Sequence, residues 1–193
     1  MSNFNIKIPL QILQYTHLSP LSIIIYGELL GLQEKYGNCH ISDETLAKRL
    51  NKSVSSIQRG MHMLKNERLI TSKQNKNHKG RTIKVKKLKD ENFLLIPEKV
   101  ERNNDLTDLA KLVYGELCAQ YKVWKKIADD SYKEGEVEDV ADEKGTMTKA
   151  ELANRMHLST RTIRRRIAEL EKKKLIEIRQ NLGFGFFYDV FYY

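Results

Sequence analysis

Three arginines, Arg161, Arg164 and Arg165, follow Ser159 closely and form a dense group of side chains that can bind an anion. Serine is a good N-cap, so a helix should begin directly after Ser159. The apolar residues at helical spacing, which should form its buried face, are Ile163, Ile167 and Leu170. The arginines fall on the opposite face, and their planar forks suit phosphate groups and guanine edges. This pattern predicts a helix that reads DNA in the major groove; the alternative is an ordinary solvated surface.

A shorter helix is predicted immediately before this one. Thr148 and Glu151 have the spacing of a capping box, which satisfies the free N–H groups at a helix start. His157-Leu158 then leaves room only for a tight turn. Two helices joined by such a turn form a helix-turn-helix, whose second helix enters the major groove. Thr160 and Thr162 should lie near phosphates or thymine methyl groups.

The same pattern occurs earlier in the chain, so the sequence contains an internal repeat. Tyr26-Gly27-Glu28-Leu29 recurs as Tyr114-Gly115-Glu116-Leu117, and Ile8-Pro9 recurs as Ile96-Pro97 with the same offset. After an insertion in the second copy, the match resumes. The matched residues there are Leu46-Ala47 and Leu152-Ala153, Arg49 and Arg155, Ser53 and Ser159, and Leu69-Ile70 and Leu175-Ile176.

In the first copy, Ser42 should cap a short helix, Asn51-Lys52 should form the turn, and Ser53 should cap the recognition helix. The candidates for DNA contact on it are Ser55, Ser56, Gln58, Arg59 and His62. Gln58 could pair with adenine and Arg59 with guanine. This set differs from the three arginines of the second copy, so a site bound by both helices cannot be a true palindrome. One chain would then act as its own pseudo-dimer, with half-sites about one helical turn apart and an affinity that falls steeply with salt.

A β-hairpin signature follows each recognition helix, which makes each copy a winged helix. The basic residues of the first wing that should touch phosphates are Lys73, Lys76, Lys79 and Arg81. The second tip, about residues 179–185, is far less charged and should contact DNA less. The expected fold is α+β, mostly α. It consists of two tandem winged helix-turn-helix domains at 1–88 and 89–193, and the second contains an acidic insertion at about 129–145.

The composition favours a polyanionic partner, because the 193 residues carry a formal net charge of +9. The acidic insertion is most simply a solvated loop, and the alternatives are a protein-binding patch or a segment that discourages nonspecific DNA contact. Cys39 and Cys118 are far apart and should be buried thiols, with no metal site. No apolar run could span a membrane and no signal peptide precedes the first copy, so we expect a cytoplasmic protein. The sequence has no catalytic motif, so we expect a protein that is not an enzyme and that binds no cofactor.

The order of elements and the phrase LSPLSIIIYGELL, with YGNCHISDETLAKRL after it, resemble winged helix-turn-helix domains of plasmid, phage and conjugative-element proteins of Gram-positive bacteria. The tandem arrangement is similar to the TraN family of conjugation proteins, and more distantly to the N-terminal domain of RepA-type replication initiators. The resemblance implies a double-stranded DNA binder that represses or assists a mobile-element locus and works as a monomer with an internal pseudo-two-fold. The alternatives are a plasmid or phage replication initiator or accessory protein, and a winged-helix adaptor between proteins.

Overall fold

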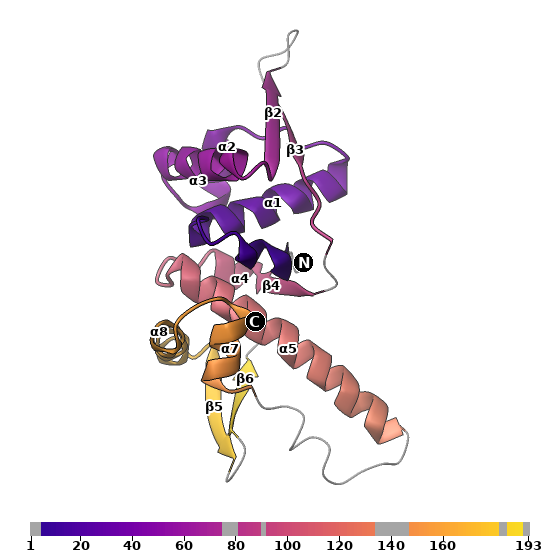
Figure 1. Ribbon diagram of the computed structural model, residues 1–193, viewed down its shortest axis with the longest axis vertical. Helices are drawn as coiled ribbons and strands as arrows, with labels where there is room; N and C mark the ends of the chain where they lie inside the picture. The colour runs from indigo at the N-terminus through magenta and orange to yellow at the C-terminus, as the bar shows by residue number, and fades with distance from the viewer. Residues whose placement is uncertain (1–4, 75–80, 90–91, 134–146, 182–184, 191–193) are drawn as a thin grey trace. The chain divides into compact units, whose positions relative to one another are not determined.

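The computed structural model describes residues 5–74, 81–89, 92–133, 147–181 and 185–190, and of residues 5, 121–133 and 179–190 it describes the backbone alone. Contacts between residues divide the chain into two units, 1–112 and 113–193. The repeat predicted a boundary at residue 88 instead, so the segment between the two positions belongs by sequence to the second copy and by contacts to the first unit. The predicted fold class is confirmed: helices predominate and small sheets accompany them (Figure 1).

The first unit starts with strand β1 (Asn5–Pro9) and a 3-10 helix η1 (Leu10–Gln14), and continues with three helices, α1 (Pro20–Tyr36), α2 (Asp43–Leu50) and α3 (Val54–Asn66). The hairpin β2 (Ile70–Gln74) and β3 (Arg81–Val85) follows and projects from these helices in Figure 1. Strand β4 (Phe93–Pro97), helix α4 (Glu98–Glu101) and the start of α5 (Asp108–Lys133) complete the unit.

Helix boundaries in the first unit follow the caps that the sequence predicts. The hydroxyl of Ser42 accepts the backbone N–H of Thr45 at 3.1 Å, and that of Ser53 accepts the N–H of Ser56 at 3.2 Å. Each cap satisfies one of the N–H groups that have no partner within the helix. The helices α2 and α3 therefore begin where the sequence places them, with Asn51 and Lys52 between them.

The first wing is fastened to α1 by an amide side chain. Gln33 donates to the carbonyl of Val85 at 3.0 Å, and its own oxygen accepts the N–H of Val85 at 2.7 Å. The phenol of Tyr26, which is fully buried, donates to the carbonyl of Lys86 at 2.7 Å. On the same edge of β3, the N–H of Ile83 bonds to the carbonyl of Cys39. These bonds fix the base of the wing on the helical core.

Strand β4 pairs with β1 in antiparallel register, although the sequence assigns the two strands to different copies. Lys7 lies opposite Leu95, and these two positions are equivalent in the repeat. Ile6 pairs with Ile96 and Ile8 with Leu94, so a local two-fold axis exchanges the two strands. All four of these apolar side chains are buried.

Close packing between helix α1 and β1 depends on one glycine. A Cβ at Gly27 would lie 2.4 Å from Cγ1 of Ile8 and 2.7 Å from Cγ2 of Ile6, closer than side-chain carbons approach. At Gly60 in α3 the corresponding contact is with the end of a flexible side chain, Cδ1 of Ile25, at 2.6 Å. The absence of a side chain at Gly27 thus lets the helix lie directly on the strand.

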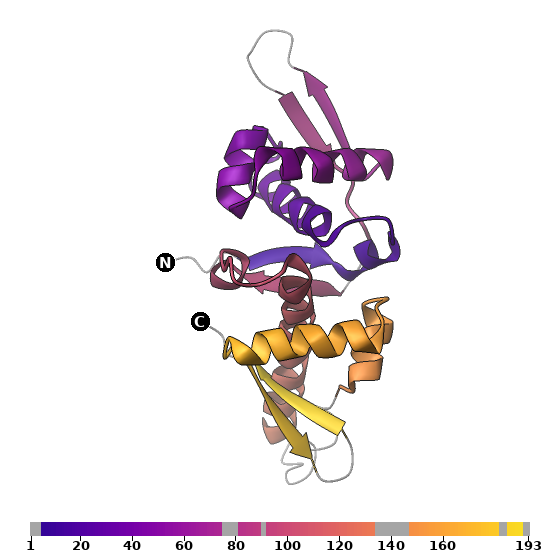
Figure 2. The same cartoon turned by 90° about the vertical axis from the view of Figure 1, so that its left-hand side faces the viewer.

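The second unit takes the larger part of α5 and adds α7 (Lys149–Arg155), α8 (Thr160–Lys172) and the hairpin β5 (Ile176–Asn181) and β6 (Gly185–Val190) (Figure 2). The predicted capping box is present: the N–H of Glu151 donates to Thr148, and the N–H of Thr148 donates to the Glu151 carboxylate at 2.7 Å. Strand β5 extends to Asn181, so the turn predicted at 179–185 is shorter than expected. Helix α5 includes residues 129–133 of the predicted insertion, and the rest of the insertion lies outside the described residues.

Two turns of the repeat have the same backbone geometry in both units. Asn51 and His157, between the paired helices, have φ of 48° and 52°. Arg68 and Lys174, between the recognition helix and the wing, have φ of 56° and 55°. In these last two turns, the N–H of Leu69 donates to the carbonyl of Leu64, and the N–H of Leu175 donates to the carbonyl of Leu170. Each bond closes a Schellman motif.

Candidate nucleic-acid interface

The exposed face of α3 carries most of the residues that the sequence assigns to DNA contact. Ser55, Gln58, Arg59 and His62 are exposed, and Ser56 is half-buried. This face is opposite the buried residues of α3, which are Ile57, Gly60, Met61 and Leu64. The helix thus presents a polar surface of mixed hydrogen-bond donors and acceptors, which suits base edges.

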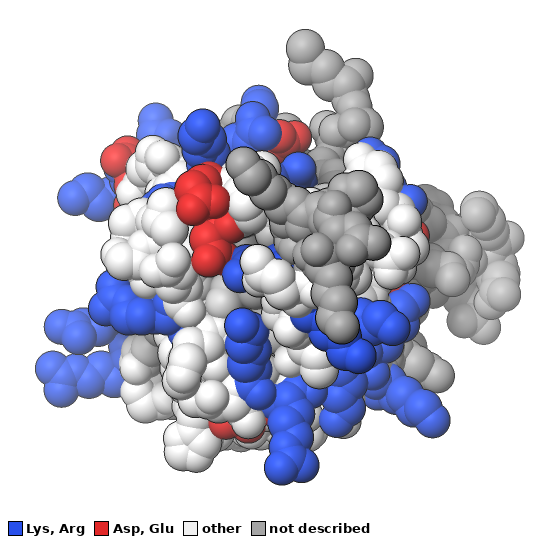
Figure 3. Space-filling view, turned by 90° about the horizontal axis from the view of Figure 1, so that it is seen from above, with Lys and Arg blue, Asp and Glu red and all other residues white. Residues whose placement is uncertain are grey.

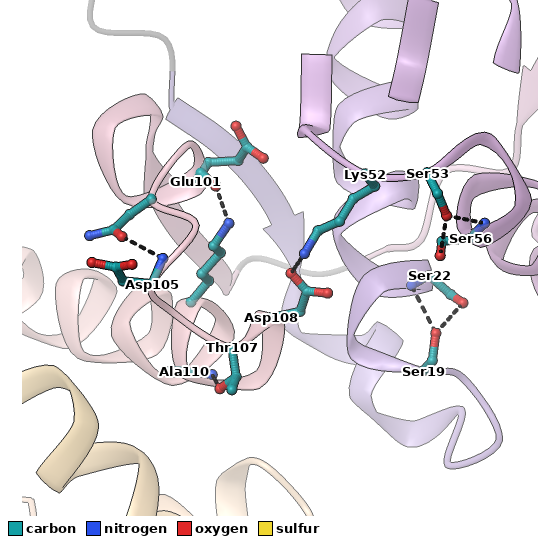
Figure 4. A network of polar contacts seen from close by, with 12 residues as sticks. Ser19, Ser22, Lys52, Ser53, Ser56, Glu101, Asp105, Thr107, Asp108 and Ala110 are labelled. Atoms are coloured by element: carbon teal, nitrogen blue, oxygen red, sulfur yellow. Dashed lines mark hydrogen bonds and ion pairs between the residues drawn. The ribbon is translucent and has the colours of Figure 1, made fainter. Parts of the chain in front are cut away.

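Hydrogen bonds at the start of α3 hold two of these side chains. The Ser56 hydroxyl lies 2.8 Å from the hydroxyl of the N-cap Ser53 (Figure 4), and Nη2 of Arg59 donates to the Ser56 hydroxyl at 3.4 Å. Nδ1 of His62 lies 3.2 Å from Nδ2 of Asn66. The Arg59 guanidinium is therefore oriented along the helix surface but keeps further donors for a ligand.

On α8, the side chains of Arg161, Arg164 and Arg165 are all exposed. Within the described part of the chain these three guanidinium groups have neither an ion pair nor a hydrogen bond. Arg166, the next residue, differs: its Nη1 lies 2.7 Å from the carboxylate of Glu169, and it is only 21% exposed. Helix α8 thus presents three arginines to solvent, whereas the fourth, Arg166, pairs with a glutamate of the same helix.

The two threonines predicted beside these arginines are half-buried. The N–H of Thr162 donates to the N-cap Ser159, and their hydroxyls are 2.8 Å apart. Thr162 therefore has a structural partner at the helix start. Thr160 is the first residue of the helix, where backbone N–H groups favour a phosphate.

The first wing gives its basic residues different environments. Lys73 is exposed on β2, whereas Lys76 and Lys79 lie outside the described residues. Arg81 forms a two-bond ion pair with Asp43 at the start of α2 and is 22% exposed. Its guanidinium joins the wing to the helix-turn-helix, so a phosphate would have to share this group with Asp43. Lys84 on β3 is exposed and was not among the predicted contacts.

Basic side chains outnumber acidic ones on the surface at this end of the first unit. Figure 3, seen from above Figure 1, shows lysine and arginine in several groups on this face, with uncharged areas between them and acidic side chains in small areas only. Part of the first unit's basic character is used internally: Nζ of Lys52, in the helix-turn-helix turn, lies 2.8 Å from the carboxylate of Asp108 (Figure 4). The positive charge of the other basic side chains favours the binding of a polyanion.

Two ion pairs between a buried glutamate and a more exposed arginine were missed by reasoning from the sequence. Glu28 in α1 pairs with Arg49 in α2 at 2.5 Å, and Glu116 in α5 pairs with Arg155 in α7 at 2.6 Å. Both pairs join equivalent positions of the repeat, so the recurrence of an acid and a base in the matched residues was the available signal. Desolvation raises the pKa of Glu28, and the neighbouring Arg49 opposes this shift.

The described residues contain no group of three metal-binding side chains, and no described helix is long and apolar enough to cross a bilayer. Cys39 and Cys118 are buried free thiols, as predicted. Burial raises the pKa of Cys39 to about 11, so its thiol stays protonated at neutral pH.

Comparison with known families agrees with this geometry. Residues 16–70 match a helix-turn-helix domain family, and residues 140–177 match a winged helix-turn-helix DNA-binding family. No curated protein matches the chain. Families of this kind are typically non-enzymatic regulators. Each match covers one of the two helix-turn-helix motifs described above, and the chain is therefore a tandem winged helix-turn-helix protein of the DNA-binding type.

Proposed function

We propose that this protein represses or assists a locus of a conjugative plasmid or related mobile element by occupying a specific duplex site. The observation that carries the proposal is the pair of exposed recognition faces, one with Gln58 and Arg59 and the other with three exposed arginines, Arg161, Arg164 and Arg165. Specific recognition requires hydrogen-bonding groups that reach base edges. Helix α3 offers donors and acceptors, and the arginines of α8 offer donors. Bound protein would block polymerase by occupying the promoter.

The two recognition helices differ, so the proposed site is an asymmetric or imperfect repeat. The register of β1 and β4 supports an internal pseudo-dimer, because Lys7 and Leu95 occupy equivalent positions and lie opposite one another. Two recognition helices in one chain are what a repeated site on a duplex would match. We therefore expect one chain for each site.

The residues have different roles in this proposal. The base-reading residues are Ser55, Gln58 and Arg59 on α3 and Arg161, Arg164 and Arg165 on α8. The remaining candidates contact phosphates or the groove wall, and they are Ser56, His62, Lys73, Lys76, Lys79, Arg81, Thr160 and Thr162. Phosphate contacts fix the position of the protein on DNA but carry no sequence information.

The test is selection of genomic fragments by the purified protein at about 150 mM salt, followed by footprinting. One asymmetric footprint with two protected major-groove segments is expected. Replacing Arg161, Arg164 and Arg165 by alanine should remove the preference for that site, with about 1–3 kcal/mol lost for each arginine that reads a base. The matched control is Lys172→Ala at the end of the same helix, which should keep the preference.

Uniform weak protection that disappears as salt rises would show that the arginines hold phosphates only, and would refute specific recognition. A footprint at a replication origin instead of a promoter would favour the initiator role. That role can be checked separately by asking whether the gene is required for plasmid maintenance.

A further inference from the structure

In both units, a buried glutamate of the long helix binds an arginine at the end of the first helix of the helix-turn-helix. Glu28 is 3% exposed and its Oε1 lies 2.5 Å from Nη2 of Arg49. Glu116 is 1% exposed and its Oε1 accepts a hydrogen bond from Nε of Arg155 at 2.6 Å. The two pairs occupy equivalent positions of the repeat, so an acid and a base meet at matching places in both units, through Nη2 in the first and through Nε in the second.

These pairs are poorly explained by stability alone. Burial of a carboxylate costs free energy, and a buried ion pair often stabilises a protein no better than apolar side chains of the same size would. An arginine fork is directional, however, because its donors lie in one plane and meet a carboxylate in few geometries. Such a contact can fix the rotation of a helix about its own axis, which apolar packing specifies less well.

Both arginines lie next to the turn that leads into the recognition helix. Arg49 and Arg155 stand at or beside the last residue of α2 and α7, directly before the turn to the recognition helix. In each turn an N–H bonds back to that first helix: Lys52 to Ala47 and Leu158 to Ala153, both at 2.9 Å. A turn this short and this closely bonded passes the orientation of the first helix on to the second.

We propose that Glu28–Arg49 and Glu116–Arg155 are positioning pairs, which set the angle of each recognition helix relative to the long helix of its unit. This inference rests on the proposed DNA recognition, because the orientation of α3 and α8 matters only if their side chains reach base edges. The glutamates do not contact DNA in this account. They act through the arginines and the turns.

The two pairs are not equally constrained. Oε1 of Glu116 also accepts a hydrogen bond from Nε2 of Gln120, at 3.0 Å. The equivalent position in the first unit is Leu32, which cannot donate and instead lines an open hollow of about 290 Å³ beside Glu28. The pair in the second unit is thus held by two donors, and we expect the larger effect on recognition there.

The experiment uses the full chain with the double substitution Glu116→Leu and Arg155→Met. These apolar replacements keep volume and avoid leaving one charge buried alone. The thermal midpoint should stay close to that of the unmodified protein. Affinity for the selected duplex should fall about tenfold or more, as for the loss of one base-reading contact, while affinity for a mixed-sequence duplex stays constant.

A second variant, Glu116→Gln, covers the case in which the double variant does not fold, because its amide oxygen can still accept from Arg155. It should retain most of the specific affinity. The control is Glu98→Ala with Arg102→Ala, which removes an exposed ion pair of 2.5 Å on α4 and should change neither affinity.

Unchanged specific affinity in a folded double variant would overturn the positioning role. So would an equal loss of affinity for both duplexes. If the unmodified protein shows no sequence preference, it is the proposed function that fails.

Discussion

Removing residues 89–193 should unfold the first winged helix, although the first copy of the repeat is complete at residue 88. Strand β4 supplies the partner of β1, and α4 follows it. Leu94 and Ile96 are 0% exposed and Val100 is 2% exposed. Burial of a side chain of this size contributes about 1.5–3 kcal/mol, so these three contribute roughly 5–9 kcal/mol. A whole domain is stable by about 5–15 kcal/mol, so this loss removes most of the stability.

The assay compares two fragments, 1–88 and 1–112, by urea unfolding followed with far-ultraviolet circular dichroism and by amide NMR spectra. Fragment 1–112 should show a cooperative transition and dispersed amide signals, because it keeps β4 and α4. Fragment 1–88 should show neither. A cooperative transition of 1–88 at the midpoint of 1–112 would refute the reasoning, since β4 would then add nothing to the fold.

A point substitution in the full chain checks the same contact without truncation. Leu94→Ala should lower the free energy of unfolding by about 2–5 kcal/mol, because it leaves a cavity under β1. Leu95→Ala, one residue along the same strand and only half-buried, should cost much less. Equal effects of the two substitutions would mean that this strand has no preferred face.

Three further predictions concern packing, backbone geometry and ionisation. Gly27→Ala should lower the free energy of unfolding by about 1–3 kcal/mol through overpacking, and Gly60→Ala by less, because the side chain that it meets can move; thermal denaturation measures both. Arg68→Gly should raise the free energy of unfolding by about 0.5 kcal/mol, because glycine has no penalty at positive φ, whereas Lys65→Gly within α3 should lower it by about 1 kcal/mol. Desolvation raises the pKa of Glu101 in the folded protein above its ordinary value of 4.5. At a pH between the unfolded and the folded pKa, the folded protein keeps a proton that the unfolded chain has lost, so the free energy of unfolding falls as the pH rises. Glu101→Gln should flatten that part of the pH dependence in urea unfolding, and an unchanged slope would contradict the assignment.

The helix starts and the tight turns were predictable because they depend on residues close together in sequence. Ser42, Ser53, Thr148 and Ser159 cap the helices that the sequence places after them, and the capping box at Thr148 is present. A cap needs only an oxygen within about three residues of a free N–H group, so the signal is local. The exposed positions of the predicted recognition residues follow from the same helical periodicity.

The positive φ angles of Arg68 and Lys174 and the ion pair of Arg81 were not predictable in this way. Arg68 and Lys174 adopt positive φ without being glycine or asparagine, so residue type gives no indication of the turn. Arg81 seemed suited to phosphate by its place in a basic wing, but Asp43 lies far from it in sequence and meets it only after folding. Whether Arg81 also contacts phosphate stays a prediction.

The sequence by itself determined the two copies, their helix-turn-helix motifs and the chemical difference between the two recognition faces. Only the tertiary structure decided that the lead-in strand of the second copy pairs with that of the first, and that Glu28 and Glu116 are buried against arginines. The physical reason is the separation along the chain of the residues that interact. Caps and periodicity act over a few residues of chain, whereas strand pairing and the desolvation of a carboxylate depend on segments that become neighbours only when the core forms.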